Sequence, residues 1–524
     1  MSQTRNRRVE DIKIIKRAIS LLLFISCFIE ILVYPKITNV VLSFTSILSL
    51  IIFNKYIFRY DIIVKSPIAF LMFLNIQFFM YLPIPVTLLD GISADHDLLN
   101  PLTTFICQFL YYLITAVSFI LAIRKVTNRN NRFTKQLKRI GFFSAPSVKF
   151  LWVLGAGGMV PRLILMVTPI EIGAGMLAIL SFFMYSPILI LFRPLLGCPK
   201  ASPFHRKLVY FYIIGIVILL IGTNGRHYMI TPILIFIAGS FTTYFLNQYK
   251  RSILTVKNIF IIITIFLIVS GPISNLATAM VIVRSLRSDI SFEQLIQETW
   301  NTANNKEAIK QYMLLQENIG DNVLRTSWNE NYVSNVFLER FCNYRVVDAT
   351  IYHANKVGWC DEIMINKFVN ALMILPPTPI PDILFGVSKT DTEGSQMDVL
   401  YARSTHQPIA AGLIVGGDVG LGLSVFGLCF FIIQFVVYYW FFRLINSLVF
   451  RLKDGRIVLS MFTLIQFMEY FNMFTVHSGI VRHIGFLFWN FWWITFIIVF
   501  IYKLLGYLLS NSSLKLANPK QFLW

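Results

Sequence analysis

The stretch RSTHQPIAAGLIVGGDVGLG, residues 403–422, places an Arg, a His and an Asp immediately before an unbroken run rich in Phe, Ile and Val. That run is centred near Phe430. It is long enough to cross roughly 30 Å of hydrocarbon as a helix, which takes about 17–25 apolar residues. Arg403, His406 and Asp418 therefore bracket a point where the chain enters a membrane, and the five glycines of the stretch allow backbones to approach closely there.

The composition assigns the whole chain to the membrane class. Of its 524 residues, 56% are hydrophobic and 15% aromatic, whereas only 14% are charged. A soluble globule could not bury 48 Phe side chains, so the sequence predicts an all-α, polytopic integral membrane protein. We expect twelve transmembrane helices, centred near Phe24, Ser46, Leu74, Tyr112, Gly158, Met184, Ile216, Phe236, Ile265, Phe430, Leu464 and Trp492.

The distribution of charge predicts the orientation. Seven segments, comprising the two ends and alternate loops, carry 31 Lys and Arg against 4 Asp and Glu, while the rest of the chain carries 15 against 22. By the positive-inside rule these segments are cytoplasmic, with both termini. Nucleic acid is not expected as a partner, because the basic residues are divided among short segments with no folded basic domain. Attraction to anionic membrane lipids is compatible with the pattern.

One predicted outer loop is much longer than the others. We expect transmembrane helices 1–9 within residues 1–273, a large extracytoplasmic loop at 274–403, and transmembrane helices 10–12 within 404–524. The loop has mainly helical periodicity, and connections of this size are usually functional. It contains Cys342 and Cys360, for which a disulfide and two free thiols both remain open.

Several arginines occupy positions that call for an anionic partner. Arg226 falls in a short outer turn, where its guanidinium could bind a phosphate or extend to lipid headgroups. Arg162 lies inside a span, where a charge usually faces a cavity or pairs with an acidic residue. Arg340 falls on the apolar stripe of a predicted helix over 333–352, and its partner could be Asp348 or a ligand phosphate.

Familiar catalytic motifs are absent from the sequence. It contains no P-loop, no GxGxxG, no HExxH and no cysteine pair with zinc-type spacing to His. This argues against an ATP-driven pump or a metalloprotease. For His406 alone, a hydrogen-bonded structural role is the simpler interpretation.

The segment HQPIAAGLIVGGDVG resembles a pattern, His-[Asn/Ser/Gln]-x9-Gly-x-x-Gly, at the end of the large periplasmic loop in the O-antigen ligase and Wzy-type O-antigen/capsule polymerase group. His406, Gln407, Gly417 and Gly420 occupy its four fixed places. The predicted architecture is similar over most of the chain, and GTNGRHYMITPILIF resembles the family's short Arg-bearing turn. Some of these polymerases have two comparable large loops, whereas this chain has one, so a two-loop account of donor and acceptor capture does not transfer.

The resemblance implies an integral-membrane glycosyltransferase of the GT-C type in the bacterial inner membrane. Its substrate would be oligosaccharide repeat units on undecaprenyl pyrophosphate, and a polymerase would move the growing glycan onto the next lipid-linked unit. A flippase and a chain-length regulator would be its partners in O-antigen or capsule biosynthesis. We expect metal-independent chemistry and no cofactor, since no acidic pair at metal-ligand spacing is evident.

The same resemblance suggests roles for the polar residues. His406 suits a general base near neutral pH, and Asp418 could orient its ring or act as the base instead. Fixed cations would stabilise the departing pyrophosphate. The candidates are Arg226, Arg340, Arg345, Arg403, Arg162, Arg284 and Arg287.

Three other functions remain open at this stage. An O-antigen ligase uses the same donor and a similar His motif but transfers the glycan to lipid A core. A flippase or other transporter would also have about a dozen spans, although it would not need so large an outer loop. A non-catalytic subunit of an envelope-polymer assembly is the third.

Overall fold

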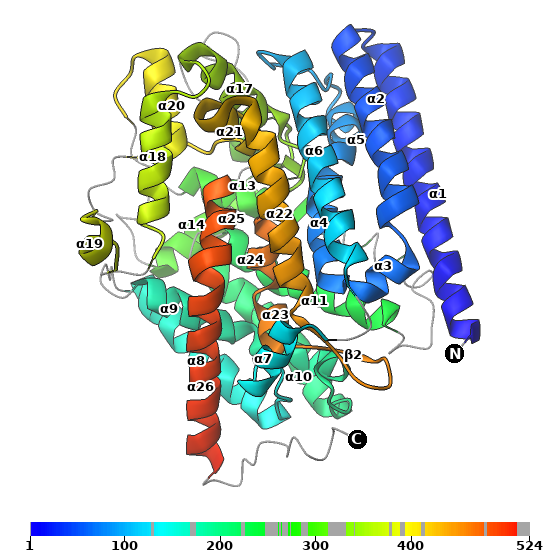
Figure 1. Cartoon of the computed structure of the whole chain (residues 1–524), viewed down its shortest axis with the longest axis vertical. Coiled ribbons are helices and arrows are strands. Elements are labelled where there is room, and N and C mark those ends of the chain that lie inside the picture. The colour runs from blue at the N-terminus through cyan, green and yellow to red at the C-terminus, as the bar shows by residue number, and fades with distance from the viewer. Residues whose placement is uncertain are drawn as a thin grey trace.

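In the residues that it describes, the computed structural model is almost entirely helical, with one two-stranded hairpin (Figure 1). It describes residues 2–126, 130–167, 174–221, 226–246, 260, 264, 271–272, 274–283, 292–305, 307–312, 332–339, 341–376, 380–387, 394–409, 414–475 and 479–510.

The N-terminal part contains α1 Ser2–Val33, α2 Ile37–Ile52, α3 Tyr60–Lys65, α4 Pro67–Tyr81, α5 Pro83–Leu89, α6 Pro101–Arg124, α7 Arg132–Arg139, α8 Val148–Val167, α9 Ala174–Ser181, a 3₁₀ stretch Phe182–Leu196, α10 Pro203–Ile221 and α11 Arg226–Phe245. The predicted outer segment contains α13 Ser274–Ile282, α14 Phe292–Asn304, α16 Val336–Glu339, α17 Tyr344–Val357, α18 Glu362–Met373, α19 Ile380–Phe385 and α20 Gln396–Thr405. The C-terminal part contains α21 Asp418–Phe426, α22 Phe430–Asn446, β1 Val449–Arg451, β2 Ile457–Leu459, α23 Met461–Ile465, α24 Phe467–Asn472, α25 Ile480–Gly485 and α26 Phe491–Ser510. The strands pair antiparallel, with Phe450 opposite Val458.

Within the described residues, seven helical stretches are long and apolar enough to cross a membrane: Ile37–Ile57, Pro101–Arg124, Val148–Leu165, Leu177–Leu196, Pro203–Leu220, Asp418–Asn446 and Ile480–Leu504. The bent pair α4 and α5 makes an eighth if it is one span. The chain is thus an all-α polytopic membrane protein. The count of twelve spans and the GT-C arrangement stay predictions, and most of the run around Ile265 lies outside the described residues.

Two of the predicted spans are broken in the structure. The helix axis bends by 50° between α4 and α5, at Leu82. Pro83 follows the bend, and proline can neither donate a backbone hydrogen bond nor accommodate the preceding turn of a helix. The run around Leu464 is divided at Gln466 into the short, buried helices α23 and α24 rather than forming one helix of span length.

The predicted helix over 333–352 is also wrong as a single element. Its apolar positions are divided between α16 and α17. Asn343 ends the irregular connection, because its side chain accepts a hydrogen bond from the backbone N–H of Val346 at 3.2 Å and caps α17. The spacing of apolar residues does not predict that a capping residue within the stripe begins a new helix.

The helices form a continuous body rather than a membrane part with a detached outer domain. In Figure 1, α6 lies between α2 and α22, and α17, α20 and α21 gather at the upper left. The outer-segment helix α17 packs against both α21 and α6. Asp348 of α17 accepts a hydrogen bond from the Thr104 hydroxyl of α6 at 2.8 Å, so the two parts are joined by buried contacts.

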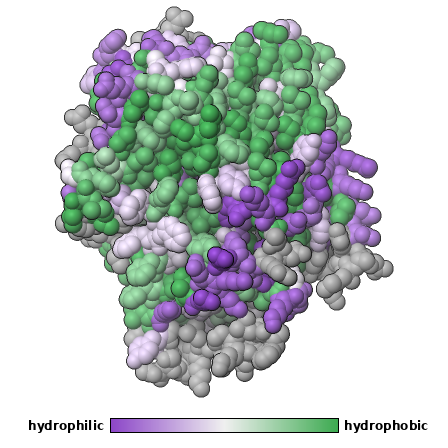
Figure 2. Space-filling model, in the orientation of Figure 1, coloured by the Kyte–Doolittle hydropathy of each residue, from purple (hydrophilic) through white to green (hydrophobic). Residues whose placement is uncertain are grey.

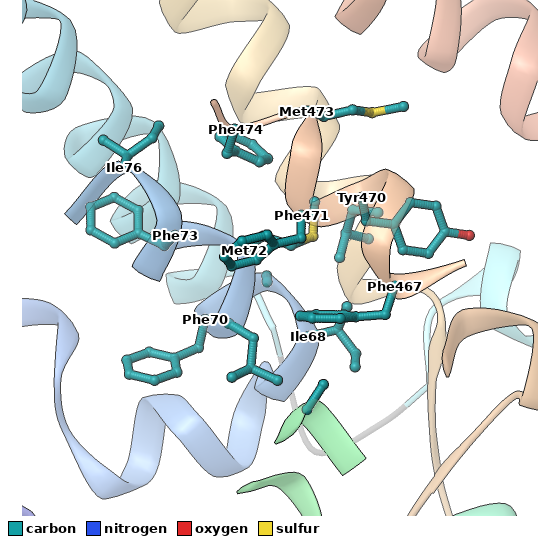
Figure 3. Close-up of a cluster of buried hydrophobic side chains, with 14 of the residues drawn as sticks. Ile68, Phe70, Met72, Phe73, Ile76, Phe467, Tyr470, Phe471, Met473 and Phe474 are labelled. Carbon is teal, nitrogen blue, oxygen red and sulfur yellow. The ribbon is translucent and has the colours of Figure 1, made fainter. Parts of the chain in front are cut away.

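A buried aromatic cluster joins α4 to the C-terminal helices. Figure 3 shows Met72 and Ile68 of α4 beside Phe471 and Phe467 of α24, whereas the Phe70 and Phe73 rings lie on the opposite side of α4. The side-chain amide of Asn75 donates to the Phe471 carbonyl at 2.8 Å within this cluster. Helices far apart in the sequence are thereby held side by side.

Figure 2 shows hydrophobic side chains over α6 and α22, with a hydrophilic region below them over α7 and the hairpin. The basic residues there include Arg132, Lys135, Lys138 and Arg139 of α7. These residues belong to segments that the charge pattern predicts to be cytoplasmic. The first turn of α1 and the end of α26 also lie in the lower half of Figure 1, although the topology itself stays a prediction.

We expect Phe73→Ala to destabilise the protein by about 3–5 kcal/mol, because it empties a buried site. The Phe73 ring is fully buried and lies 5.0 Å from Phe119 and 5.8 Å from Tyr112 between ring centroids. Thermal unfolding in detergent would measure the effect. Phe211→Ala is the control, since this side chain is 72% exposed in the isolated chain and should matter little.

Candidate functional site

The two glycines of the motif let α21 close onto the backbone of α17. A Cβ atom on Gly420 would lie 2.5 Å from the carbonyl carbon of Thr350, and one on Gly417 would lie 2.9 Å from the Cα of Val347. The Gly417 N–H also donates to the Thr350 hydroxyl at 2.8 Å. The Gly-x-x-Gly spacing therefore has a direct packing cause, because any larger residue would separate the two helices.

Asp418 is the first residue of α21 and is buried. One carboxylate oxygen accepts from the Tyr111 hydroxyl of α6 at 2.8 Å, and the other accepts from the Gly479 N–H at 2.5 Å. The Tyr438 hydroxyl in turn contacts that of Tyr111. Asp418 thus joins α21 to α6 and to the start of α25, and its carboxylate is directed into the interior.

His406 ends α20, and its side chain is exposed. Its φ of 58° lies in the left-handed region, which is uncommon for a residue other than glycine. The Gln407 N–H donates to the Ala402 carbonyl at 3.2 Å and closes the last turn of the helix. An exposed imidazole at a helix end is accessible to a substrate, whereas Asp418 makes its contacts elsewhere.

Arg403 lies one turn before His406 on α20. Its Nη2 atom forms an ion pair with Asp361 at 2.7 Å, and the other oxygen of Asp361 caps α18 by accepting from the Met364 N–H at 3.0 Å. The Nε atom of Arg403 is buried and has no hydrogen-bond partner within the described part of the chain. Arg403 is therefore held in place with donor capacity left for an anion.

Arg345 lies in the first turn of α17 and is buried. Its Nη1 atom is 3.7 Å from a carboxylate oxygen of Asp97. Asp348, one turn further on, accepts from the backbone N–H groups of Leu99 at 2.5 Å and Asn100 at 2.8 Å. Burial raises the pKa of Asp348, although these hydrogen bonds partly offset the effect. The loop 90–100 is thus joined to the start of α17 by an ion pair and two hydrogen bonds.

His353 is a buried residue of this region that the sequence analysis did not single out. Its Nδ1 atom lies 2.6 Å from the Ser404 hydroxyl, between Arg403 and His406 in sequence, and its ring packs edge-on against Tyr401. Burial, with a smaller effect of Lys356, lowers the pKa of His353 to about 4, so the ring is neutral at pH 7. The sequence does contain a sign that His353 is buried, which is its helical spacing from Val346 and Thr350. These three residues form a second buried face of α17.

The structure brings four of the predicted residues onto three helices that pack together: Arg345 on α17, Arg403 and His406 at α20, and Asp418 on α21. Arg345 and the helix that carries Arg403 lie at different positions along α17. The α20 helix contacts α17 at His353, eight residues or about 12 Å of helix from Arg345.

Of the other predicted arginines, the structure describes the side chain of Arg162 alone. Arg162 is buried on α8, which packs against α9 and the 3₁₀ stretch in the lower half of Figure 1. Arg226 begins α11, but its side chain lies outside the described residues, as do Arg284, Arg287 and Arg340. The convergence of Arg226 and Arg403 on one outward-facing cavity stays a prediction. Cys342 and Cys360 are free thiols, one buried and one exposed.

We expect Gly420→Ala to destabilise the protein by about 1–3 kcal/mol, because its methyl group would collide with the α17 backbone. Thermal unfolding in detergent would measure the change. Gly215→Ala in α10 is the matched control, since a Cβ there meets nothing within 4 Å. Equal stability of the two variants would contradict the packing role of Gly420.

The buried His353 should make stability fall as the pH is lowered. Its folded-state pKa of about 4 lies below the ordinary 6.5, so the unfolded chain binds the proton more readily. Its contribution is present above pH 6.5 and is lost as the pH falls toward 4, by up to roughly 3 kcal/mol. Thermal unfolding at several pH values should show a weaker acid dependence for His353→Gln than for the wild type. An equal acid dependence of the two proteins would contradict this.

No protein-family model, characterised protein or solved structure matches the chain. The structure itself establishes a helical membrane protein in which the packed helices α17, α20 and α21 carry Arg345, Arg403, His406 and Asp418. A function for the chain is therefore inferred from the chemistry of these residues.

Proposed function

We propose that this protein is a metal-independent integral-membrane glycosyltransferase that polymerises lipid-linked oligosaccharide repeat units. It would act on the outer face of the bacterial inner membrane, with both termini cytoplasmic. The observation that supports this most is the closure of α21 onto α17 through Gly417 and Gly420. This contact gives Gly417 and Gly420 of the motif a packing role. It holds together the helices that carry Arg345, Arg403 and His406.

The donor in this proposal is a glycan on undecaprenyl pyrophosphate. As the bond between the sugar C1 and the phosphate oxygen breaks, the electron pair leaves with the lipid pyrophosphate, whose negative charge increases. Arg403 is suited to this charge because its guanidinium side chain is partly exposed and Asp361 fixes its orientation. Arg345 is the second cation of the region, and Arg226, Arg340, Arg284, Arg287 and Arg162 remain candidates.

The acceptor is a sugar hydroxyl of the next lipid-linked unit. Its oxygen forms the new bond to C1, and His406 takes its proton. An imidazole can accept a proton near neutral pH, and the exposed position of His406 leaves the ring accessible. Asp418 would act through structure, because it holds α21 against α6 and α25 rather than contacting the substrate.

The test is transfer by purified protein supplied with synthetic undecaprenyl-pyrophosphate-linked repeat units in the presence of a chelator. We expect a ladder of glycan lengths. Loss of a general base should lower the rate by about 10²–10⁴-fold in His406→Ala, and loss of a fixed cation by about 10²–10³-fold in Arg403→Ala. Arg456→Ala is the matched control, since this exposed arginine pairs with Asp454 at the hairpin and should leave the rate unchanged.

The other outcomes of this assay separate the competing functions. Transfer that appears only when lipid A core is supplied would identify a ligase with the same site. Movement of unaltered units between leaflets would identify a transporter, and unchanged units with well-folded protein would leave a structural subunit. A ladder with normal rates in both site variants would refute the roles of His406 and Arg403.

A further inference from the structure

A second buried polar cluster lies where α1 and α2 meet the loop 90–100. Glu30 of α1 is fully buried, and one of its carboxyl oxygens, Oε1, accepts from the Ala94 N–H at 2.9 Å. Asn39 of α2, also fully buried, donates through Nδ2 to the Ser93 hydroxyl oxygen at 2.9 Å. The same Ser93 oxygen lies 3.5 Å from Oε1 of Glu30. Three chain segments therefore meet at Ser93.

The hydrogen bonds of this cluster leave two acceptors without a donor. The single hydroxyl proton of Ser93 goes to Asp95, whose carboxylate also receives Lys36 and the Thr38 hydroxyl. The second carboxyl oxygen of Glu30 and the amide oxygen of Asn39 are both buried and have no hydrogen-bond partner within the described residues. Two buried acceptors cannot satisfy each other unless one of them carries a proton.

The charges of the cluster point to the same deficit. Lys36 lies 3.1 Å from Asp95 and balances that carboxylate, which leaves an ionised Glu30 as an uncompensated buried charge. A buried charge of this kind normally becomes neutral rather than persisting. A metal ion fits less well, because an oxygen-coordinated cation such as Ca²⁺ takes about six to eight ligands, whereas two oxygens are open here.

We infer that Glu30 is a neutral carboxylic acid that donates its proton to the amide oxygen of Asn39. Its carbonyl oxygen then accepts from Ala94, and both open acceptors are satisfied. The cluster thereby locks the outer ends of α1 and α2 to residues 93–95.

This lock bears on the candidate site through the same loop. Asp97 of the loop pairs with Arg345, and the N–H groups of Leu99 and Asn100 hold Asp348. Glu30 is thus a positioning residue for the start of α17. That consequence rests on the proposed function, whereas the protonation of Glu30 does not.

The charged and titratable groups around Glu30 come from every neighbouring element. Cys27 precedes it on α1, Lys36 lies at the start of α2, Asp95 lies in the loop, and the Tyr332 hydroxyl donates to the Ala94 carbonyl at 2.6 Å. The helix α5, which also packs on α1, has no titratable side chain. Glu30→Gln removes one titrating group and leaves this set unchanged.

The decisive measurement is the infrared spectrum of the full-length protein at neutral pH. We expect a carbonyl-stretch band of a buried protonated carboxylic acid that is lost in Glu30→Gln and shifted in Asn39→Leu. Glu10→Gln, at an exposed position of the same helix, should leave the band unchanged. Persistence of the band in Glu30→Gln, or its absence from the wild type, would overturn the inference whether or not the protein transfers glycans.

A stability series provides the second test. Because glutamine can donate to Asn39 and accept from Ala94 as the neutral acid does, Glu30→Gln should unfold near the wild-type temperature and Glu30→Ala well below it. Wild-type stability should fall as the pH rises through the range in which the folded protein keeps the Glu30 proton and the unfolded chain loses it, and Glu30→Gln should lack this loss. A glutamine variant as unstable as the alanine variant would show that Glu30 is ionised. Selective loss of glycan transfer in Glu30→Ala, with Glu30→Gln retaining it, would support the positioning role.

Discussion

The arrangement of the candidate site depends on one close approach, that of α21 to the backbone of α17. Hydrogen is the only substituent that fits at Gly420, because a Cβ there would overlap Thr350. The contact lets Asp418 reach Tyr111 on α6, and it lets α20 pack on α17 so that Ser404 meets His353. The ends of three helices are therefore fixed by a backbone contact rather than by a bond between the predicted catalytic residues.

Buried carboxyl groups join parts of the protein that lie far apart in the sequence. Asp418 connects α21 with α6 and Gly479, and Asp348 connects α17 with Leu99, Asn100 and Thr104. Each accepts from backbone N–H or hydroxyl groups, which supply the hydrogen bonds that water would otherwise provide. The helices of the predicted outer segment are held to the rest of the protein in this way.

The fold class follows from composition, but the details of individual spans do not. The bend at Leu82 has a visible cause in Pro83, whereas the break at Gln466 occurs inside an apolar run with no proline or glycine. The single helix expected over 333–352 fails because hydrophobic periodicity continues across a cap formed by Asn343. Hydrophobic periodicity indicates which face of a helix is buried, but it does not indicate where one helix ends and the next begins.

The sequence by itself determined that this is a helical membrane protein and that a polar group stands at the start of the span after residue 403. It also marked His406, Arg403 and the two glycines of the motif, because their types and spacing are unusual beside an apolar run. Only the tertiary structure decided their partners: Asp361 for Arg403, Tyr111 and Gly479 for Asp418, and His353 for Ser404. The physical reason is that side-chain identity limits which bonds a residue can make, whereas the choice among partners depends on which distant segments pack against it.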